Sequence, residues 1–196
     1  MQNKLSMKDF AVKLLKENLP LYYFYHNERH TLYVLQIALK IGEDYHCTPH
    51  EMQLITAAAL WHDTGLIVKY IGHEEESCKF ARQHLPGFGF STQDIQKVCG
   101  MIMATHIPQS PANKLEEIIA DADLEYLGTD RASEISMLLF RELNYLDPTL
   151  TRTEWISKQI QFVREHHYFT RYCSANRERP KKAYLNYLLA QHTKVT

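Results

Sequence analysis

The chain carries almost no signal for β-strands, and this constrains its fold more than any other feature. Glycine is scarce, with 7 residues among 196, and no segment alternates apolar and polar residues with the period of two that a half-buried strand requires. Apolar residues make up 45% of the chain, enough for the core of one domain of this length. The sequence therefore predicts an all-α, single-domain, compact bundle of about seven to nine helices.

Helix start signals recur along the chain. At several places a small polar residue stands three positions before an acidic residue, at the beginning of an apolar helical pattern, a spacing typical of N-caps. These pairs are Ser6 with Asp9, Thr48 with Glu51, Ser91 with Asp94 and Asn113 with Glu116, and Asn27 is a further cap. With the breaks between them, they predict helices at about 7–18, 27–46, 49–63, 73–84, 91–106, 113–128, 130–146, 153–168 and 181–192.

The charge and the apolar pattern exclude several classes of partner. The formal net charge is -1, which gives no general attraction to nucleic acid polymers or to an anionic membrane. No apolar run approaches the about 20 residues that cross a bilayer, and the N-terminal Met-Gln-Asn-Lys begins no apolar signal core. We therefore expect a cytoplasmic protein, and the sequence leaves its oligomeric state open. The cysteines, at 47, 78, 99 and 173, form no Cys-x-x-Cys pair, so we expect buried or half-buried thiols rather than a zinc knuckle or a redox motif.

Six residues of metal-binding type are dispersed through the first two thirds of the chain. Neutral imidazole and carboxylate ligands together suit zinc, iron, manganese or nickel, and a site that holds such an ion can activate water for hydrolysis. The set therefore indicates metal-dependent hydrolytic chemistry. Its members are His30, His62, Asp63, His73, His106 and Asp123.

Local sequence context indicates how these side chains reach one site. His62 and Asp63 are consecutive, so on a regular helix they diverge by roughly 100°. They can face one ion only near a helix end, which the glycine two positions later supplies. His26 stands one turn before His30, so we expect both on one helical face. Asp123 interrupts an apolar stretch, where a charge needs a partner or a metal.

Each residue also has an interpretation without a metal. A lone histidine is more often a core or surface residue than a ligand, and His-Asp dipeptides occur by chance. Asp121 and Asp123 could pair with Lys114 or Arg131 on a polar face, and the acidic run 74–76 could be a solvated helix start. The joint pattern is what favours a metal site over these separate interpretations.

Three separated blocks resemble the H…HD…D motifs of the HD-domain superfamily of metal-dependent phosphohydrolases. They are Tyr-His-Asn-Glu-Arg-His-Thr at 25–31, Ala-Ala-Ala-Leu-Trp-His-Asp-Thr-Gly at 57–65 and Ala-Asp-Ala-Asp-Leu-Glu-Tyr-Leu-Gly at 120–128. The blocks occur in the family's order, and the resemblance covers residues 22–130. It implies an HD-domain-like helical fold.

The resemblance also implies which residues bind metal. One divalent ion, of Mn, Fe, Ni, Zn or Mg, would be bound by His30, His62, Asp63 and Asp123. In members with a second ion, the aspartate of the HD pair bridges both ions, and two further histidines lie between that pair and the last aspartate. His73 and His106 match those places, so the resemblance implies one ion or two.

The implied reaction is hydrolysis of a small phosphoester, and a nucleotide is the substrate class we expect. The ions would activate a water for in-line attack on phosphorus. Catalysis would involve Asp63, together with His26 as proton donor or phosphate-orienting residue and Glu74 as a second proton-transfer or supporting residue. Two alternatives stay open: a di-iron oxygenase on the same ligand set, and a non-catalytic metal-binding regulatory HD domain.

The sequence departs from several branches of the superfamily. Leu66 stands where an HD-x-G-K motif places a lysine, which weakens assignment to the cyclic-dinucleotide phosphodiesterases and the mixed-valent di-iron oxygenases. One phosphodiesterase branch also carries a downstream Gly-Tyr-Pro motif, which is missing here. Leu127 and Gly128 follow the last aspartate motif where guanosine-alarmone synthetase-hydrolases carry an asparagine.

The C-terminal third carries a basic and aromatic segment at 164–182. Cationic groups beside aromatic rings could grip a phosphate and stack a base, but we favour a solvated basic loop before the last helix. Across the chain we expect three parts of one domain: an N-terminal helix at 1–20, the metal-binding core at 21–130 and a helical extension at 131–196. The cations of the basic segment are Arg164, Arg171, Arg177, Arg179, Lys181 and Lys182.

Overall fold

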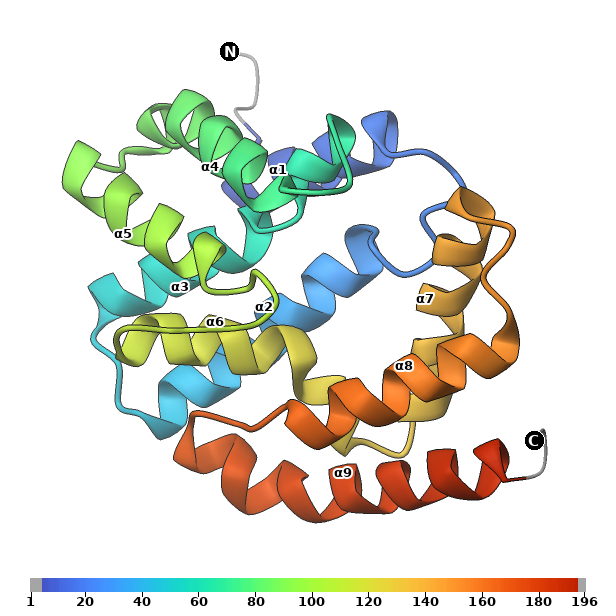
Figure 1. Cartoon of the computed structure of the whole chain (residues 1–196). Coiled ribbons are helices and arrows are strands. Elements are labelled where there is room, and N and C mark those ends of the chain that lie inside the picture. Colours follow the sequence, from blue (N-terminus) through green and yellow to red (C-terminus); the bar gives the residue numbers. More distant parts are fainter. Residues whose placement is uncertain (1–4, 194–196) are drawn as a thin grey trace. The chain divides into compact units, whose positions relative to one another are not determined.

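A computed structural model of the chain describes residues 5–193 as helices joined by short loops (Figure 1). The α-helices are α1 Met7–Asn18, α2 Glu28–Asp44, α3 Pro49–Trp61, α4 His73–His84, α5 Thr92–Met103, α6 Lys114–Leu124, α7 Ala132–Leu146, α8 Arg152–Glu165 and α9 Arg171–His192. Three short 3-10 helices are η1 Thr64–Ile67, η2 Leu85–Phe88 and η3 Glu125–Gly128. No strand occurs among the described residues, so the prediction of an all-α domain with seven to nine helices is confirmed. None of the helices in this part is long and apolar enough to span a membrane.

The predicted N-caps form as expected. The side chains of Ser6, Asn27, Thr48 and Ser91 each accept a backbone N–H from the first turn of the following helix. Asn113 does the same for α6, at 3.2 Å. Each cap satisfies an N–H that has no partner inside its helix. Local sequence therefore sets where these five helices begin.

Helix α5 is shorter than predicted. It ends at Met103 rather than at His106, because the chain turns after Ala104. The hydroxyl of Thr105 donates to the carbonyl of Ile102 at 2.8 Å and so satisfies one of the last carbonyls of the helix. His106 therefore follows the helix instead of lying on it.

Helix α9 is longer than predicted. It begins at Arg171, well before the predicted start, because the side chain of Thr170 caps its first turn. The helix continues through Pro180, which has no N–H to donate to the carbonyl of Asn176. The Nη1 group of Arg177 approaches that carbonyl at 3.5 Å and partly replaces the missing bond. The basic segment is thus largely helical, and the prediction of a loop there is wrong.

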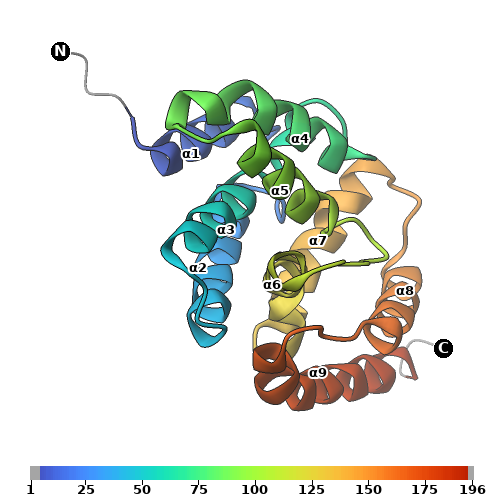
Figure 2. The same ribbon diagram turned by 90° about the vertical axis from the view of Figure 1, so that its left-hand side faces the viewer.

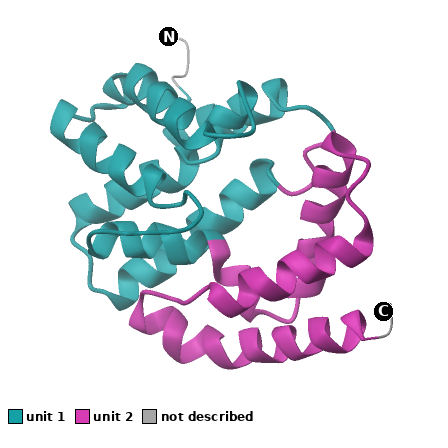
Figure 3. Cartoon of the chain, viewed as in Figure 1, with its two compact units in different colours: residues 1–21, 26–123 teal, residues 22–25, 124–196 magenta. Residues whose placement is uncertain are grey.

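Contacts within the chain divide the domain into two compact units (Figure 3). Unit 1 comprises residues 1–21 and 26–123, and unit 2 comprises residues 22–25 and 124–196. The ends at 1–4 and 194–196, including the N-terminal residues considered for a signal core, lie outside the described residues. Our expected division, with boundaries after residues 20 and 130, stays a prediction.

Helix α3 is central to unit 1. Its residues 57–61, Ala-Ala-Ala-Leu-Trp, are all fully buried, as expected of a helix that is apolar on every side. It packs against α2 and α5 and also contacts α1 and α4. Figure 2 shows α2 and α3 side by side. The residues that directly follow this helix, His62 and Asp63, are therefore held inside the unit.

In unit 2, η3 packs against α7 and α9, and α8 packs against α9. Gly128 in η3 lies so close to α9 that a Cβ there would stand 2.5 Å from the carbonyl oxygen of Arg177. The segment 22–25 joins this unit through α7, where the carboxylate of Glu142 accepts the N–H of Tyr25 at 2.9 Å. The close approach of α9 to Gly128 gives this residue, the last glycine of the third motif block, a packing role.

Candidate metal centre

Three elements of unit 1 bring predicted ligands together. His30 lies in the first turn of α2, which Asn27 caps. His62 and Asp63 directly follow the last residue of α3, and Asp123 lies in the last turn of α6. Because α3 ends before them, the consecutive side chains of His62 and Asp63 can face the same point, as their sequence context predicted.

The ligand atoms of these four residues surround one point. His30 Nε2 lies 2.9 Å from Asp123 Oδ1 and 3.4 Å from His62 Nε2. Asp63 Oδ2 lies 3.5 Å from His30 Nε2 and 3.2 Å from His62 Nε2. The distance from His62 Nε2 to Asp123 Oδ1 is 3.7 Å. An ion with bonds of about 2.1 Å places neighbouring ligand atoms about 3.0 to 3.4 Å apart. The observed separations therefore fit the ligands of a single divalent ion.

The site is buried, and one of its carboxylate oxygens lacks a hydrogen bond. His62 and Asp63 are 1% and 3% exposed, and Asp63 Oδ2 has no hydrogen-bond partner among the described residues. An unsatisfied buried carboxylate oxygen costs free energy unless a cation compensates it. This oxygen faces both His30 and His62. A divalent cation held by the set would satisfy it, so the donors present fit such an ion.

Backbone carbonyls orient two of the imidazoles. His62 Nδ1 donates to the carbonyl of Ala59 at 2.9 Å, and His73 Nδ1 donates to the carbonyl of Tyr70 at 2.9 Å. Because a carbonyl only accepts, each Nδ1 carries a ring hydrogen, and each Nε2 is the atom available to a metal. Bonds of this kind fix the ring orientation of metal-binding histidines. Both Nε2 atoms approach Asp63, at 3.2 Å for His62 and 3.4 Å for His73.

The histidines and carboxylates of the site stabilise each other's charged forms. Burial alone would lower the pKa of His62, but the negative charges of Asp63 and Asp123 raise it well above its ordinary value. Burial would likewise raise the pKa of Asp63, but His62 holds it well below its ordinary value. Protons and metal cations compete for the same imidazole nitrogens. The site is therefore one where positive charge is favoured.

His73 approaches the same aspartate from the other side. His73 Nε2 lies 3.4 Å from Asp63 Oδ1, whereas Asp63 Oδ2 faces His30 and His62. The carboxylate thus presents one oxygen to the imidazoles of His30 and His62 and the other oxygen to the imidazole of His73, as a bridging ligand would. The next residue, Glu74, is buried, and its Oε2 has no hydrogen-bond partner within residues 5–193. That oxygen lies 3.9 Å from His73 Nδ1, so Glu74 stands directly behind the ring of His73.

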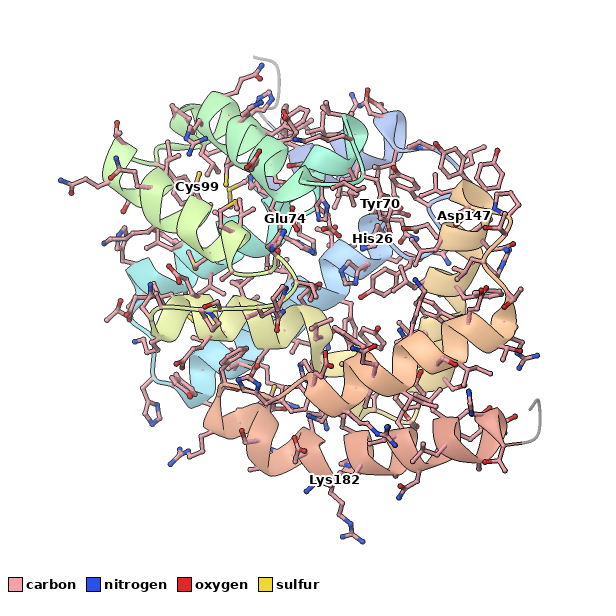
Figure 4. All side chains as sticks on the ribbon, viewed as in Figure 1. His26, Tyr70, Glu74, Cys99, Asp147 and Lys182 are labelled. Carbon is pink, nitrogen blue, oxygen red and sulfur yellow. The ribbon has the colours of Figure 1, made fainter. Side chains whose placement is uncertain are left out.

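His26 lies beside this cluster but not on α2. The helix begins only after Asn27, its cap, so the prediction that His26 and His30 share one helical face is wrong. The ring centre of His26 nevertheless lies 6.0 Å from that of His30, 6.1 Å from that of His73 and 5.7 Å from that of Tyr70. Figure 4 shows His26 and Tyr70 next to each other. His26 is therefore a neighbour of the ligands, held by the chain that leads into α2.

His106 is the predicted ligand that the structure does not bring to this set. It follows α5, and its side chain is exposed. Among the described residues, the group that could hold a metal ion consists of His30, His62 and Asp123, whose ligand atoms lie within 4.8 Å of one another. Asp63 and His73 join it through the contacts given above, but no side-chain contact links His106 to any of them.

The interpretations without a metal fit the structure poorly. Lys114 pairs with Glu51 at 2.8 Å and Arg131 pairs with Glu134 at 2.9 Å, so each cation has another carboxylate partner, and Asp123 lies against His30 at 2.9 Å. In the acidic run 74–76, the central residue is exposed, but Glu74 is buried. The expectation of a solvated helix start therefore holds for Glu75 but not for Glu74.

Two residues that hold the site, Ser77 and Tyr70, were not predicted from the sequence. Ser77 on α4 donates its hydroxyl hydrogen to the carbonyl of His62 at 2.5 Å and accepts the N–H of Gly65 at 2.8 Å, so it fixes the turn after α3. Gly65 admits no side chain there, because a Cβ would stand 1.9 Å from the carbonyl of His73. The sequence signal for Ser77 was its position one helical turn after His73, which places both side chains on the same face of α4. Tyr70 acts through its carbonyl, which no side-chain pattern indicates.

Comparisons with known proteins agree with this fold. The sequence model described as HD domain matches residues 27–125, half of the chain and all six predicted ligands. No curated protein matches the chain. A predicted HD superfamily hydrolase from an uncultured Thermotogales bacterium has a similar structure, with 17% identity and a TM-score of 0.63 over 96% of this chain and 92% of that one. YpgQ from Bacillus subtilis, in complex with ADP, gives 18% identity and a TM-score of 0.64 over 96% of this chain and 98% of that one.

Proposed function

The chain belongs to the HD domain family, and we propose on that basis that it is a metal-dependent phosphohydrolase acting on a small, nucleotide-like phosphoester. The observation that carries the proposal is the convergence of the His30, His62, Asp63 and Asp123 ligand atoms on one point. A divalent ion bound there supplies Lewis-acid chemistry, which stabilises charge on phosphoryl oxygens and makes water more acidic.

Two observations support the substrate class. YpgQ, a protein of similar fold at 18% identity, was solved in complex with ADP. The net charge of this chain is -1, so no general electrostatic attraction favours a long polyanion. We therefore propose a small nucleotide or a similar phosphoester, and neither a nucleic acid polymer nor a membrane, as the partner.

The basic segment at 164–182 contributes less to this proposal than its composition suggests. Two of its cations serve unit 2 internally. Arg177 pairs with the fully buried carboxylate of Glu125, and Lys181 is buried and donates to the carbonyl of His166 at 2.7 Å. These two side chains are therefore structural, and we do not assign phosphate binding to the segment.

We propose that the site holds two ions, with Asp63 between them. Its Oδ2 faces the imidazoles of the first group, and its Oδ1 faces His73 Nε2 at 3.4 Å. Two ions would stabilise charge on both the attacking and the leaving oxygens of an in-line displacement. His106 stays a predicted ligand of the second ion. If it binds, His106→Ala loses the same metal equivalent as His73→Ala.

His26 is the residue we propose to contact the leaving group. Its ring lies near those of His30 and His73, at 6.0 Å and 6.1 Å between centres, yet it is not part of the ligand set. A histidine in such a position can donate a proton to the departing oxygen or orient the phosphate. Glu74 is proposed as a supporting residue, because its buried carboxylate stands behind the ring of His73. That carboxylate would favour the orientation in which His73 Nε2 faces Asp63.

The function is tested by a hydrolysis screen of phosphomonoesters and phosphodiesters, with protein loaded with manganese, nickel or iron. We expect the wild-type protein to hydrolyse at least one class, and Asp63→Ala to be slower by about 100-fold or more, since the ion contributes several kcal/mol to the transition state. Asp130→Ala, at an exposed aspartate, is the matched control and should behave as the wild type.

Two outcomes would reject the proposal. One is a metal-loaded wild-type protein that hydrolyses no member of the panel. The other is an Asp63→Ala variant that hydrolyses the panel as fast as the wild type does. Bound iron with oxygen consumption and no hydrolysis would instead indicate the di-iron oxygenase alternative.

A further inference from the structure

Two thiols meet at the interface between α4 and α5, outside the metal centre. Cys78 on α4 and Cys99 on α5 are 3% and 5% exposed. Cys78 Sγ lies 3.5 Å from the carbonyl oxygen of Cys99, and Cys99 Sγ lies 3.8 Å from the carbonyl oxygen of Cys78. Figure 4 places Cys99 where α5 faces α4. Each sulfur therefore rests on the backbone of the other cysteine.

This reciprocal contact places the two thiols at one point of the α4–α5 interface, as a disulfide between these helices requires. A disulfide needs Cα atoms within about 7 Å and Cβ–Sγ bonds that point toward one another. Here each Sγ lies against the carbonyl oxygen of the other cysteine, so both side chains lie in the same part of the interface.

The two thiols also differ in reactivity. The contact with Cys78 lowers the pKa of the Cys99 thiol against the opposing effect of burial, and the charge of Arg82 lowers it further. The contact with Cys99, with burial, raises the pKa of the Cys78 thiol. The thiolate is the nucleophilic form of cysteine. The lower pKa favours Cys99 as the attacking sulfur, and Cys78 is then the sulfur that resolves the product.

We propose that Cys78 and Cys99 are a redox-active pair that a hydroperoxide converts into a reversible disulfide joining α4 to α5. The Cys99 thiolate attacks one peroxide oxygen, an S–O bond forms, the O–O bond breaks, and the released hydroxide or alkoxide takes up a proton. Cys78 then loses its proton and attacks the sulfenic sulfur; an S–S bond forms, the S–O bond breaks, and water leaves. Two thiols are thus oxidised by two electrons, and the peroxide is reduced.

The position of the bond gives it a consequence for α4. Cys78 stands one turn after Glu74, and α4 begins with His73. The disulfide would close the chain between residues 78 and 99 and restrict the unfolded state. It would therefore stabilise unit 1 and anchor to α5 the helix that bears His73. This inference rests on the α4–α5 contact and holds whatever reaction the metal centre performs.

The test counts thiols in the folded wild-type protein before and after treatment with stoichiometric hydrogen peroxide. We expect two of the four thiols to disappear, the intact mass to fall by two hydrogens, and a peptide crosslinked through Cys78 and Cys99. Dithiothreitol should restore all four. Thermal unfolding of the oxidised protein should shift upward by about 5 °C.

Two variants separate this pair from the other cysteines. Cys99→Ala should keep its remaining thiols under the same treatment and show no thermal shift. The double variant Cys47→Ser with Cys173→Ser should still form the crosslink. Four surviving thiols in the wild type, a crosslink that joins other cysteines, or an equal loss of thiols in Cys99→Ala would overturn the proposal. Mapping the wild-type peptides needs no variant, so the test stands even if Cys99→Ala folds poorly.

Discussion

At the scale of single residues, Asp63 is a charged side chain in a buried position, where burial of its carboxylate costs free energy. It follows a helix whose last five residues are fully buried, and it is itself 3% exposed. Its two oxygens face different histidines, Oδ2 toward His62 at 3.2 Å and Oδ1 toward His73 at 3.4 Å. A buried carboxylate is tolerated where positive charge compensates it. Any cation that the site binds offsets the cost of burying this group, which couples metal binding to stability.

Asp63→Asn tests this coupling, because asparagine keeps the shape of the side chain and removes its charge. We expect the wild type to unfold at a higher temperature in manganese at about 100 times its dissociation constant, where binding adds about 2.7 kcal/mol. Asp63→Asn should lose most of this shift. Thermal unfolding of both proteins, in chelator and in manganese, measures the difference.

The control for this experiment is Asp130→Asn, at an exposed aspartate of the same chain. It should respond to manganese as the wild type does. An equal manganese shift in Asp63→Asn and in the wild type would show that Asp63 is not a ligand.

Local signals indicated how four of the proposed ligands could come together. The Asn27 cap places His30 in the first turn of α2, and the glycine after the HD pair predicted a helix end there. His73 and His106 could not be distinguished in this way. Their distances from Asp63 depend on where α5 ends and on how α4 packs against η1, which sequence spacing does not encode. The structure brings His73 to Asp63 and leaves His106 exposed.

At the scale of elements, α9 shows why helix ends were harder to predict than helices themselves. Pro180 indicates a helix break by every local rule, yet the helix passes through it. Arg177 compensates in two ways: it approaches the carbonyl of Asn176 on its own helix, and it pairs with the carboxylate of Glu125 on η3. Local sequence does not indicate the pairing of Arg177 with Glu125, because the two residues are far apart in the chain.

Arg177→Met tests the role of this arginine in unit 2. Glu125 is fully buried, so removing the guanidinium leaves its carboxylate without the cation that pairs with it. We expect a loss of about 2 to 4 kcal/mol in the free energy of unfolding, measured by urea denaturation. Arg179→Met, at an exposed cation of the same helix, should change it by less than about 0.5 kcal/mol. Similar effects of both substitutions would contradict the structural role of the ion pair.

His166, at the end of α8, makes the stability of unit 2 depend on pH. Burial lowers its pKa to about 3, and the Lys181 ammonium, 3.3 Å from His166 Nδ1, lowers it further. The unfolded chain binds this proton near pH 6.5, so its contribution to stability is full above that pH and is lost as pH falls toward 3. The loss reaches about 1.4 kcal/mol for each pH unit.

His166→Asn keeps an acceptor for Lys181 and removes the titrating ring. Its free energy of unfolding should therefore fall less steeply between pH 6.5 and pH 3 than that of the wild type, in urea titrations at several pH values. His167→Asn, at the exposed neighbouring histidine, should follow the wild-type curve. Parallel curves for the wild type and His166→Asn would show that His166 titrates normally in the folded protein.

At the scale of the whole molecule, the helical class followed from composition and periodicity, but the grouping of helices did not. The segment 22–25 belongs with the C-terminal helices, because the N–H of Tyr25 binds Glu142, which lies more than a hundred positions later. The proposed metal centre, in contrast, lies within unit 1 and uses α2, the end of α3 and the end of α6. Its four proposed core ligands come from the three motif blocks, so their grouping was easier to predict than the packing around them.

The central claim is that His30, His62, Asp63 and Asp123 form a metal centre that shares Asp63 with a second ion. Elemental analysis of manganese-loaded, dialysed protein tests it most directly, with the wild type, Asp123→Ala and His73→Ala compared at equal protein concentration. We predict two equivalents in the wild type, one in His73→Ala, and much less than one in Asp123→Ala, since removing a ligand of the first ion weakens the whole site. Equal metal content in Asp123→Ala and the wild type would contradict the account.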